Sequence, residues 1–167
     1  AAMNPCPCGN YGSRITPCRC TAQQIQRYRN RISGPMLDRI DIHVEMGEVG
    51  YNDIAGRSCG EPSSAIRARV NAARAIQTRR YAGMGILFNA QLTNRMMNQY
   101  CVLTSDAEAL MKKAFAALKL SARAYTRLLK VSRTIADLAG SEQIKAEHIA
   151  EAIQYRSLES KYWGEIK

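Results

Sequence analysis

The chain has 167 residues, a formal net charge of +10, a pI near 9.6 and 46% hydrophobic residues. This apolar share supports a packed interior and excludes a wholly disordered chain. No run of eighteen apolar residues is present, which excludes a predicted membrane-spanning helix. The positive charge indicates an anionic partner. Six cysteines without a recognisable export signal favour a cytoplasmic protein that keeps its thiols reduced.

The first twenty residues contain two Cys-x-Cys pairs, Cys6 with Cys8 and Cys18 with Cys20. Four thiolates can enclose Zn²⁺ in a structural site, which leaves no open position for catalysis. The spacing is tighter than the commoner Cys-x₂-Cys, so free thiols and disulfides remain alternatives. We predict a structural zinc ion held by these four cysteines.

Residues 1–60 are predicted to be the short α/β remnant of a larger domain. The opening Ala-Ala-Met is expected to end a buried strand, so we expect the chain to be a piece of a longer protein. Thr21 is a plausible N-cap for a helix over 21–33. Alternating apolar residues predict a half-buried strand over 39–46, and glycines make 47–62 a predicted linker.

From Pro62 onward the apolar residues recur at helical spacing, so we predict a bundle of helices over 61–167. The first helix begins near Ser63 or Ser64, a short helix covers 91–101, Gly140 closes a clean amphipathic helix, and a last helix covers about 145–156. The residues expected to point inward include Ile66, Val70, Ala73, Ile76, Leu110, Met111, Ala114, Phe115, Leu118, Ala124, Leu128, Val131, Ile135, Leu138, Ile149 and Ile153. The predicted fold class is therefore mainly α.

The positive charge is concentrated in the first part of this bundle. Residues 62–133 hold 13 Lys or Arg and only 2 Asp or Glu, against 11 and 12 in the other 95 residues. A solvated basic face is one explanation, and DNA phosphate contacts are the other. The predicted DNA-binding residues are Arg67, Arg74, Arg79 and Arg80.

Five stretches carry a family resemblance: "AAMNPCPCG", "CRCT", "YRNRISGPMLDRIDIHVEM", "LSARAYTRLLKVSRTIADLAGSEQI" and "HIAEAIQYR". In this order they resemble the C-terminal half of the ComM/YifB-type, magnesium-chelatase-like AAA+ ATPases. The resemblance implies a hexameric ring that uses ATP and Mg²⁺ and a helicase-like role in DNA branch migration during competence. It also implies that residues 1–60 belong to the AAA+ core and 61–167 to its helical lid.

The resemblance also implies roles for single residues. Asn4 falls on the sensor 1 position, Arg39 on the arginine finger and Arg123 on sensor 2, with Arg127 as a second choice for the nucleotide-binding residue of the lid. Without the resemblance, Asn4 is explained as a turn cap, Arg39 as an ion-pair partner of neighbouring aspartates, and Arg123 as a solvated side chain.

The sequence lacks the G-x-x-x-x-G-K-[ST] phosphate-binding loop and the acidic strand end that binds Mg²⁺. We therefore expect this chain alone to be inactive as an ATPase, with those motifs preceding it in the full-length protein. Two other functions stay open: a zinc-containing module that binds nucleic acid without ATP, and a magnesium-chelatase subunit that acts in metal insertion into tetrapyrroles.

Overall fold

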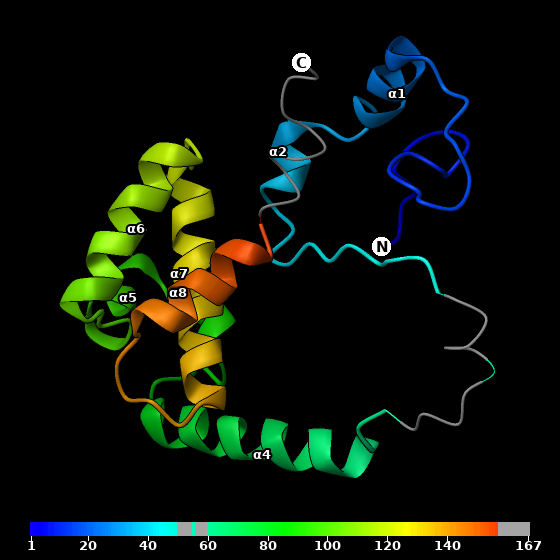
Figure 1. The fold of residues 1–167 in the computed structure, drawn as a ribbon. Helices are drawn as coiled ribbons and strands as arrows, with labels where there is room; N and C mark the ends of the chain where they lie inside the picture. Colours follow the sequence, from blue (N-terminus) through cyan, green and yellow to red (C-terminus); the bar gives the residue numbers. More distant parts are fainter. Residues whose placement is uncertain (50–54, 56–59, 157–167) are drawn as a thin grey trace.

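The computed structural model describes residues 1–49, 55 and 60–156 (Figure 1). These residues form a mainly helical fold, as predicted. The elements are α1 (Ala22–Arg29), α2 (Gly34–Leu37), α4 (Ser63–Arg80), the 3₁₀ helix η1 (Asn89–Gln91), α5 (Asn94–Tyr100), α6 (Ser105–Ala117), α7 (Ala122–Leu138) and α8 (Ala146–Gln154). Within these ranges no helix is long and apolar enough to cross a membrane.

Side-chain caps fix where several helices begin. The Thr21 hydroxyl accepts a hydrogen bond from the Gln24 N–H, and the Gln24 side chain accepts one from the Thr21 N–H, so α1 begins as predicted. The Ser121 hydroxyl caps α7 by accepting a hydrogen bond from the Ala124 N–H, without a reciprocal bond. At the other end of α7, Gly140 has φ +67°, a left-handed conformation that terminates the helix where the sequence predicted.

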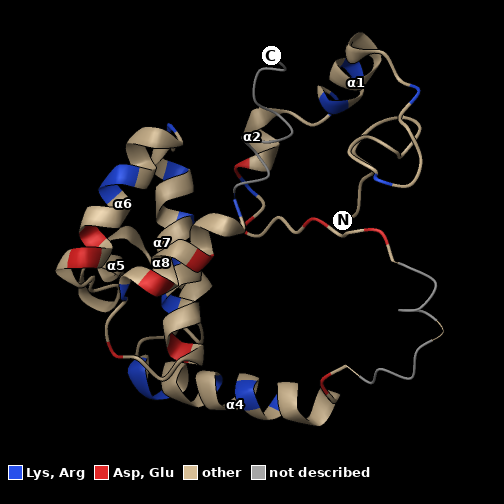
Figure 2. Ribbon diagram, in the orientation of Figure 1, with Lys and Arg blue, Asp and Glu red and all other residues tan. Residues whose placement is uncertain are grey.

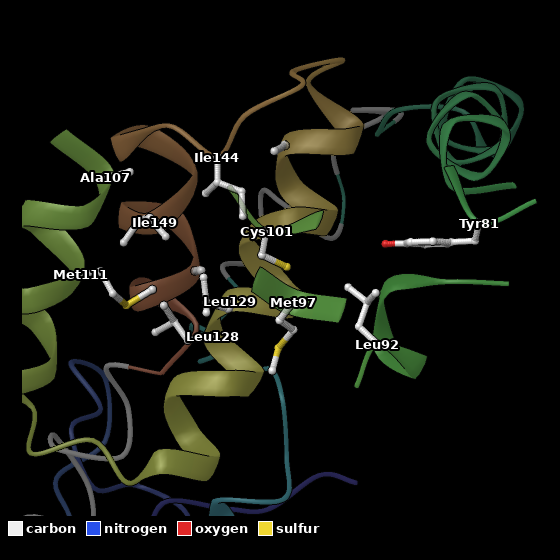
Figure 3. Close-up of a cluster of buried hydrophobic side chains, with 12 residues drawn as sticks. Tyr81, Leu92, Met97, Cys101, Ala107, Met111, Leu128, Leu129, Ile144 and Ile149 are labelled. Carbon is white, nitrogen blue, oxygen red and sulfur yellow. The ribbon is translucent and has the colours of Figure 1, made fainter. Parts of the chain in front are cut away.

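The hydrophobic core lies around α7, between α6, α8 and the segment that joins α4 to α5 (Figure 3). Leu128 and Leu129 of α7 pack there with Met111, Ile144 and Ile149. All five are buried.

Two residues predicted to point inward, one on α7 and one on α6, are exposed. Leu138 is 42% exposed, because the buried face of α7 runs through the polar Ser132, Arg133 and Asp137 instead. Phe115 is 44% exposed and lies edge-on to Tyr125 at the surface of the bundle.

Helix α4 packs on the bundle only through its C-terminal half. Ala73 and Gln77 are buried, whereas Ile66 and Val70, both predicted to point inward, are 42% and 45% exposed. The N-terminal half of α4 extends beyond α7 (Figure 1), so these two residues find no neighbouring helix among the described elements.

The predicted strand over 39–46 is wrong. Residues 41–49 have no regular secondary structure, and Val44 and Met46 are 63% and 85% exposed. A strand needs a neighbour for its ladder of hydrogen bonds, and no described segment pairs with this one. The His43 N–H instead donates to the Tyr155 carbonyl at 2.8 Å. The first four residues, expected to end a strand, are irregular as well.

A buried polar network fastens α4 and η1 to α7. The Asp137 carboxylate accepts hydrogen bonds from Arg80 at 2.9 Å, from Asn89 at 2.8 Å and from Arg133 at 3.1 Å. The side chains of Arg133 and Asp137 are fully buried. The Tyr81 hydroxyl completes the network by donating to Asn89 at 2.6 Å. Because buried charges are tolerated only when paired, this network fixes how α4 sits on the bundle.

Candidate metal centre and lid contacts

The four cysteine sulfurs of the N-terminal loop converge on one point. The Cys6 Sγ lies 3.4 Å from Cys8 Sγ and 3.7 Å from Cys18 Sγ, and all four Sγ atoms, including that of Cys20, lie within 4.8 Å of one another. A tetrahedral zinc site with Zn–S bonds of about 2.3 Å separates its sulfurs by about 3.8 Å. The donor set and its spacing therefore fit a structural Zn²⁺, and zinc binding by these four cysteines stays a prediction.

Helix α1 supports this loop. Gly9, at φ +83°, turns the chain so that its N–H donates to the Cys6 carbonyl at 3.0 Å. Arg29 of α1 is buried, donates through Nε to the Pro5 carbonyl at 3.3 Å, and stacks 4.6 Å from the centre of the Tyr11 ring. One arginine thus ties the first half of the loop to the helix at two points.

The electrostatics of the sulfurs also suit a cation. Hydrogen bonds from the backbone of Asn10 and Arg19 lower the pKa of Cys8 to about 6, whereas loss of hydration raises the pKa of Cys20 to about 12. Sulfurs this close cannot all ionise without a compensating positive charge. A divalent metal ion would supply that charge and replace the thiol protons.

We expect one zinc ion per chain in protein purified without added zinc. Cys18→Ser should remove most of the bound metal, because it deletes one of four ligands, while α4 to α8 stay helical. Cys101→Ala is the matched control, since Cys101 is buried in the hydrophobic core and is not part of the cysteine group. Elemental analysis and thiol titration measure both variants. Zinc near zero with four freely reacting thiols in the unmodified chain would contradict the site.

Side chains of α7 hold the segment around Arg39. Arg127 of α7 forms an ion pair with Asp41 and donates to the Arg39 carbonyl at 2.8 Å. At the start of α7, Ser121 Oγ donates to Asp38 at 3.0 Å.

Arg156, which follows α8, holds the same segment from the other side. It donates to the Ile40 carbonyl at 3.2 Å and lies 3.4 Å from Asp38. The sequence analysis did not predict this contact or the contacts of Arg127 with the same segment. In both cases the partners are more than 80 residues apart in the chain.

Arg39 itself is exposed, and its guanidinium has no ion pair among the described residues. The alternative explanation, an ion pair of Arg39 with Asp38 or Asp41, is not found among the described residues, because other side chains bind both carboxylates. Arg123 is also exposed, at the start of α7.

Asn4 is exposed and lies beside Gly9 of the cysteine loop. Within the described ranges, no hydrogen bond or ion pair joins the side chains of Asn4, Arg39 and Arg123 to one another. In the described part of the chain, these three side chains therefore do not bind one another.

Basic residues recur along α4 (Figure 2), and their side chains differ in their surroundings. Arg67 and Arg79 are exposed, and the exposed Arg74 lies 4.6 Å over the Phe88 ring. Arg80 is less available to DNA than these three arginines, because Asp137 occupies its guanidinium and only 16% of the side chain is exposed.

The comparisons with known proteins identify the class. Residues 60–156 match the family model "Magnesium chelatase, subunit ChlI C-terminal", and residues 1–54 match "Magnesium chelatase, subunit ChlI". The chain therefore belongs to the magnesium-chelatase-like proteins of the ComM/YifB type. It is 43% identical to competence protein ComM of Haemophilus influenzae and 41% identical to the uncharacterized protein YifB of Salmonella typhimurium, over 95% of the chain in both cases. It spans only 30% of the length of each of these relatives.

Proposed function

We propose that this chain is the sensing and lid portion of a hexameric, cytoplasmic AAA+ ATPase that acts on DNA. The observation that carries the proposal is Arg39: the lid holds its backbone in place, while its guanidinium stays exposed. An arginine presented in this way can reach the nucleotide phosphates of a neighbouring subunit, where its planar donors match phosphate oxygens. ATP turnover by full-length rings that carry a substituted Arg39 tests the proposal.

The other residues take complementary roles in this proposal. Asn4 acts as sensor 1 and orients the attacking water or the γ-phosphate, and Arg123 acts as sensor 2 towards the nucleotide of its own subunit. Arg127 is a positioning residue rather than a nucleotide contact, because its guanidinium already binds Asp41 and the Arg39 carbonyl. Residues that precede this chain in the full-length protein would hold ATP and Mg²⁺.

The exposed arginines of α4 support a role on DNA, and more specifically a role in branch migration during competence. They lie on one helix and have few acidic neighbours in sequence. Arginine contacts to phosphates are independent of base sequence, so binding should be unspecific and sensitive to salt.

The double variant Arg67→Ala/Arg79→Ala should weaken duplex DNA binding by the chain. Two lost phosphate contacts should lower the slope of log affinity against log salt by about 1.8. A titration series in fluorescence anisotropy measures this slope. Arg69→Ala is the control: it removes one positive charge from the same helix, but Arg69 is already paired with Glu61 at 2.7 Å. An equal loss in the control, or no binding at low salt, would contradict the role of α4.

Two alternative functions each have an observation in their favour. The cysteine cluster favours a zinc-containing nucleic-acid module that works without ATP. The family-model match favours a chelatase subunit that acts in tetrapyrrole metal insertion. A phosphate-binding loop upstream in the gene would exclude the first, and binding of DNA without response to a porphyrin would argue against the second.

A further inference from the structure

A second basic surface surrounds α1 and is separate from the arginines of α4. Residues 1–37 contain five arginines and no Asp, Glu or Lys. Arg29 is buried under the cysteine loop, whereas Arg14, Arg19, Arg27 and Arg31 are exposed. Four exposed positive charges without a carboxylate in the same stretch indicate an anionic partner.

Three of these arginines line two adjoining hollows. Arg27 and Arg31 border both hollows, of about 560 Å³ and 370 Å³. The larger hollow is also lined by Arg19 and Tyr28 and reaches the cysteine cluster. The smaller one is lined by the amide side chains of Gln23, Gln26 and Asn30. The whole lining therefore consists of guanidinium, amide and aromatic groups together with the cysteine loop, and it includes no carboxylate.

We propose that this surface, named here the α1 hollows, binds the backbone of single-stranded DNA. Guanidinium groups match phosphate oxygens, amides add neutral hydrogen bonds, and Tyr28 offers a ring on which a base can stack. A membrane surface suits the helix poorly, because Ile25, the apolar residue of α1, is buried against the loop. This inference rests on the proposed role on DNA but assigns a different surface from α4.

The test compares variants of the chain in fluorescence anisotropy with a labelled oligodeoxythymidine strand and a duplex of the same length. Arg27→Ala/Arg31→Ala should weaken strand binding by about tenfold or more, the equivalent of one charge-assisted hydrogen bond. It should also lower the salt slope by about 1.4, since each contact to a single strand contributes about 0.7. Arg14→Ala is the control: it removes an exposed charge outside the α1 hollows and should change binding much less.

Three other outcomes would contradict the inference. Strand binding by Arg27→Ala/Arg31→Ala equal to that of the unmodified chain would overturn the inference. Loss of zinc in step with loss of binding would overturn it too, because the arginines would then only balance the charge of the metal site. A larger effect on duplex than on strand would refute the single-strand assignment.

The α4 variants separate the two proposals. If only Arg67→Ala/Arg79→Ala loses DNA binding, the α1 inference fails and the proposed role on DNA stands. If the unmodified full-length protein binds neither strand nor duplex, both fail.

Discussion

In rings of the full-length protein, Arg39→Ala is expected to lower ATP turnover by about 10³–10⁵ and to leave nucleotide affinity largely unchanged. During hydrolysis, negative charge redistributes over the γ-phosphoryl and leaving-group oxygens, so an arginine that contacts them stabilises the transition state more than bound ATP. The exposed guanidinium of Arg39 has no ion pair in the described part of the chain, so its removal should not disturb the fold. Turnover at saturating ATP and binding of a fluorescent nucleotide measure the two effects.

Arg123→Ala is expected to differ from Arg39→Ala in the same two assays, ATP turnover and nucleotide binding. Arg123 is proposed as a lid residue that faces the nucleotide of its own subunit, so its substitution should lower nucleotide affinity and weaken the coupling between nucleotide binding and lid closure.

Unchanged ATP turnover in Arg39→Ala rings would contradict the assignment of Arg39 as an arginine finger. The chain alone should show no turnover in either form, because it lacks a phosphate-binding loop.

Asp137→Ala is expected to destabilise the helical bundle by about 3–5 kcal/mol, the usual effect of removing one partner from a buried ion pair. The carboxylate neutralises Arg133, whose side chain is fully buried, and Arg80, which anchors α4. Without it, the buried guanidinium loses its counter-charge, and Asn89 loses an acceptor. Urea unfolding followed by far-ultraviolet circular dichroism measures the free energy of unfolding.

Glu108→Ala is the control for this stability prediction. Glu108 pairs with Lys112 on the surface of α6 at 3.0 Å, and such exposed pairs contribute at most about 1 kcal/mol. A loss in Asp137→Ala no larger than in Glu108→Ala would show that the network is not what fastens α4 to α7.

The sequence predicted the helical bundle and the convergence of the four cysteines, because both depend on short-range patterns, whereas zinc binding stays a prediction. Thr21 caps and Gly140 terminates a helix through residues next to them in the chain, and the two cysteines of each Cys-x-Cys pair are separated by a single residue. The inward face of α7 was harder to predict. Periodicity assigned Leu138 to it, whereas Asp137 occupies the core because it pairs with Arg80 of α4, 57 residues away, and Arg133 does so because it pairs with Asp137.

The surroundings of Arg39 could not be read from the sequence for the same reason. Adjacent aspartates suggested a local ion pair, but Arg127 and Arg156 take those carboxylates from the far end of the chain. The predicted strand over 39–46 failed because alternation of apolar residues shows which face a strand would bury and does not provide the neighbouring strand that it needs.

Subunit mixing tests most directly whether Arg39 acts across a ring interface. Full-length subunits with Arg39→Ala are mixed with subunits mutated in the lysine of the phosphate-binding loop, each inactive alone, and ATP turnover is measured after subunit exchange has been demonstrated. If Arg39 acts in trans, some junctions pair an intact arginine with an intact loop, and partial turnover returns. A mixture that has exchanged subunits and remains as inactive as its parents would contradict the account and leave Arg39 without a role at the neighbouring nucleotide.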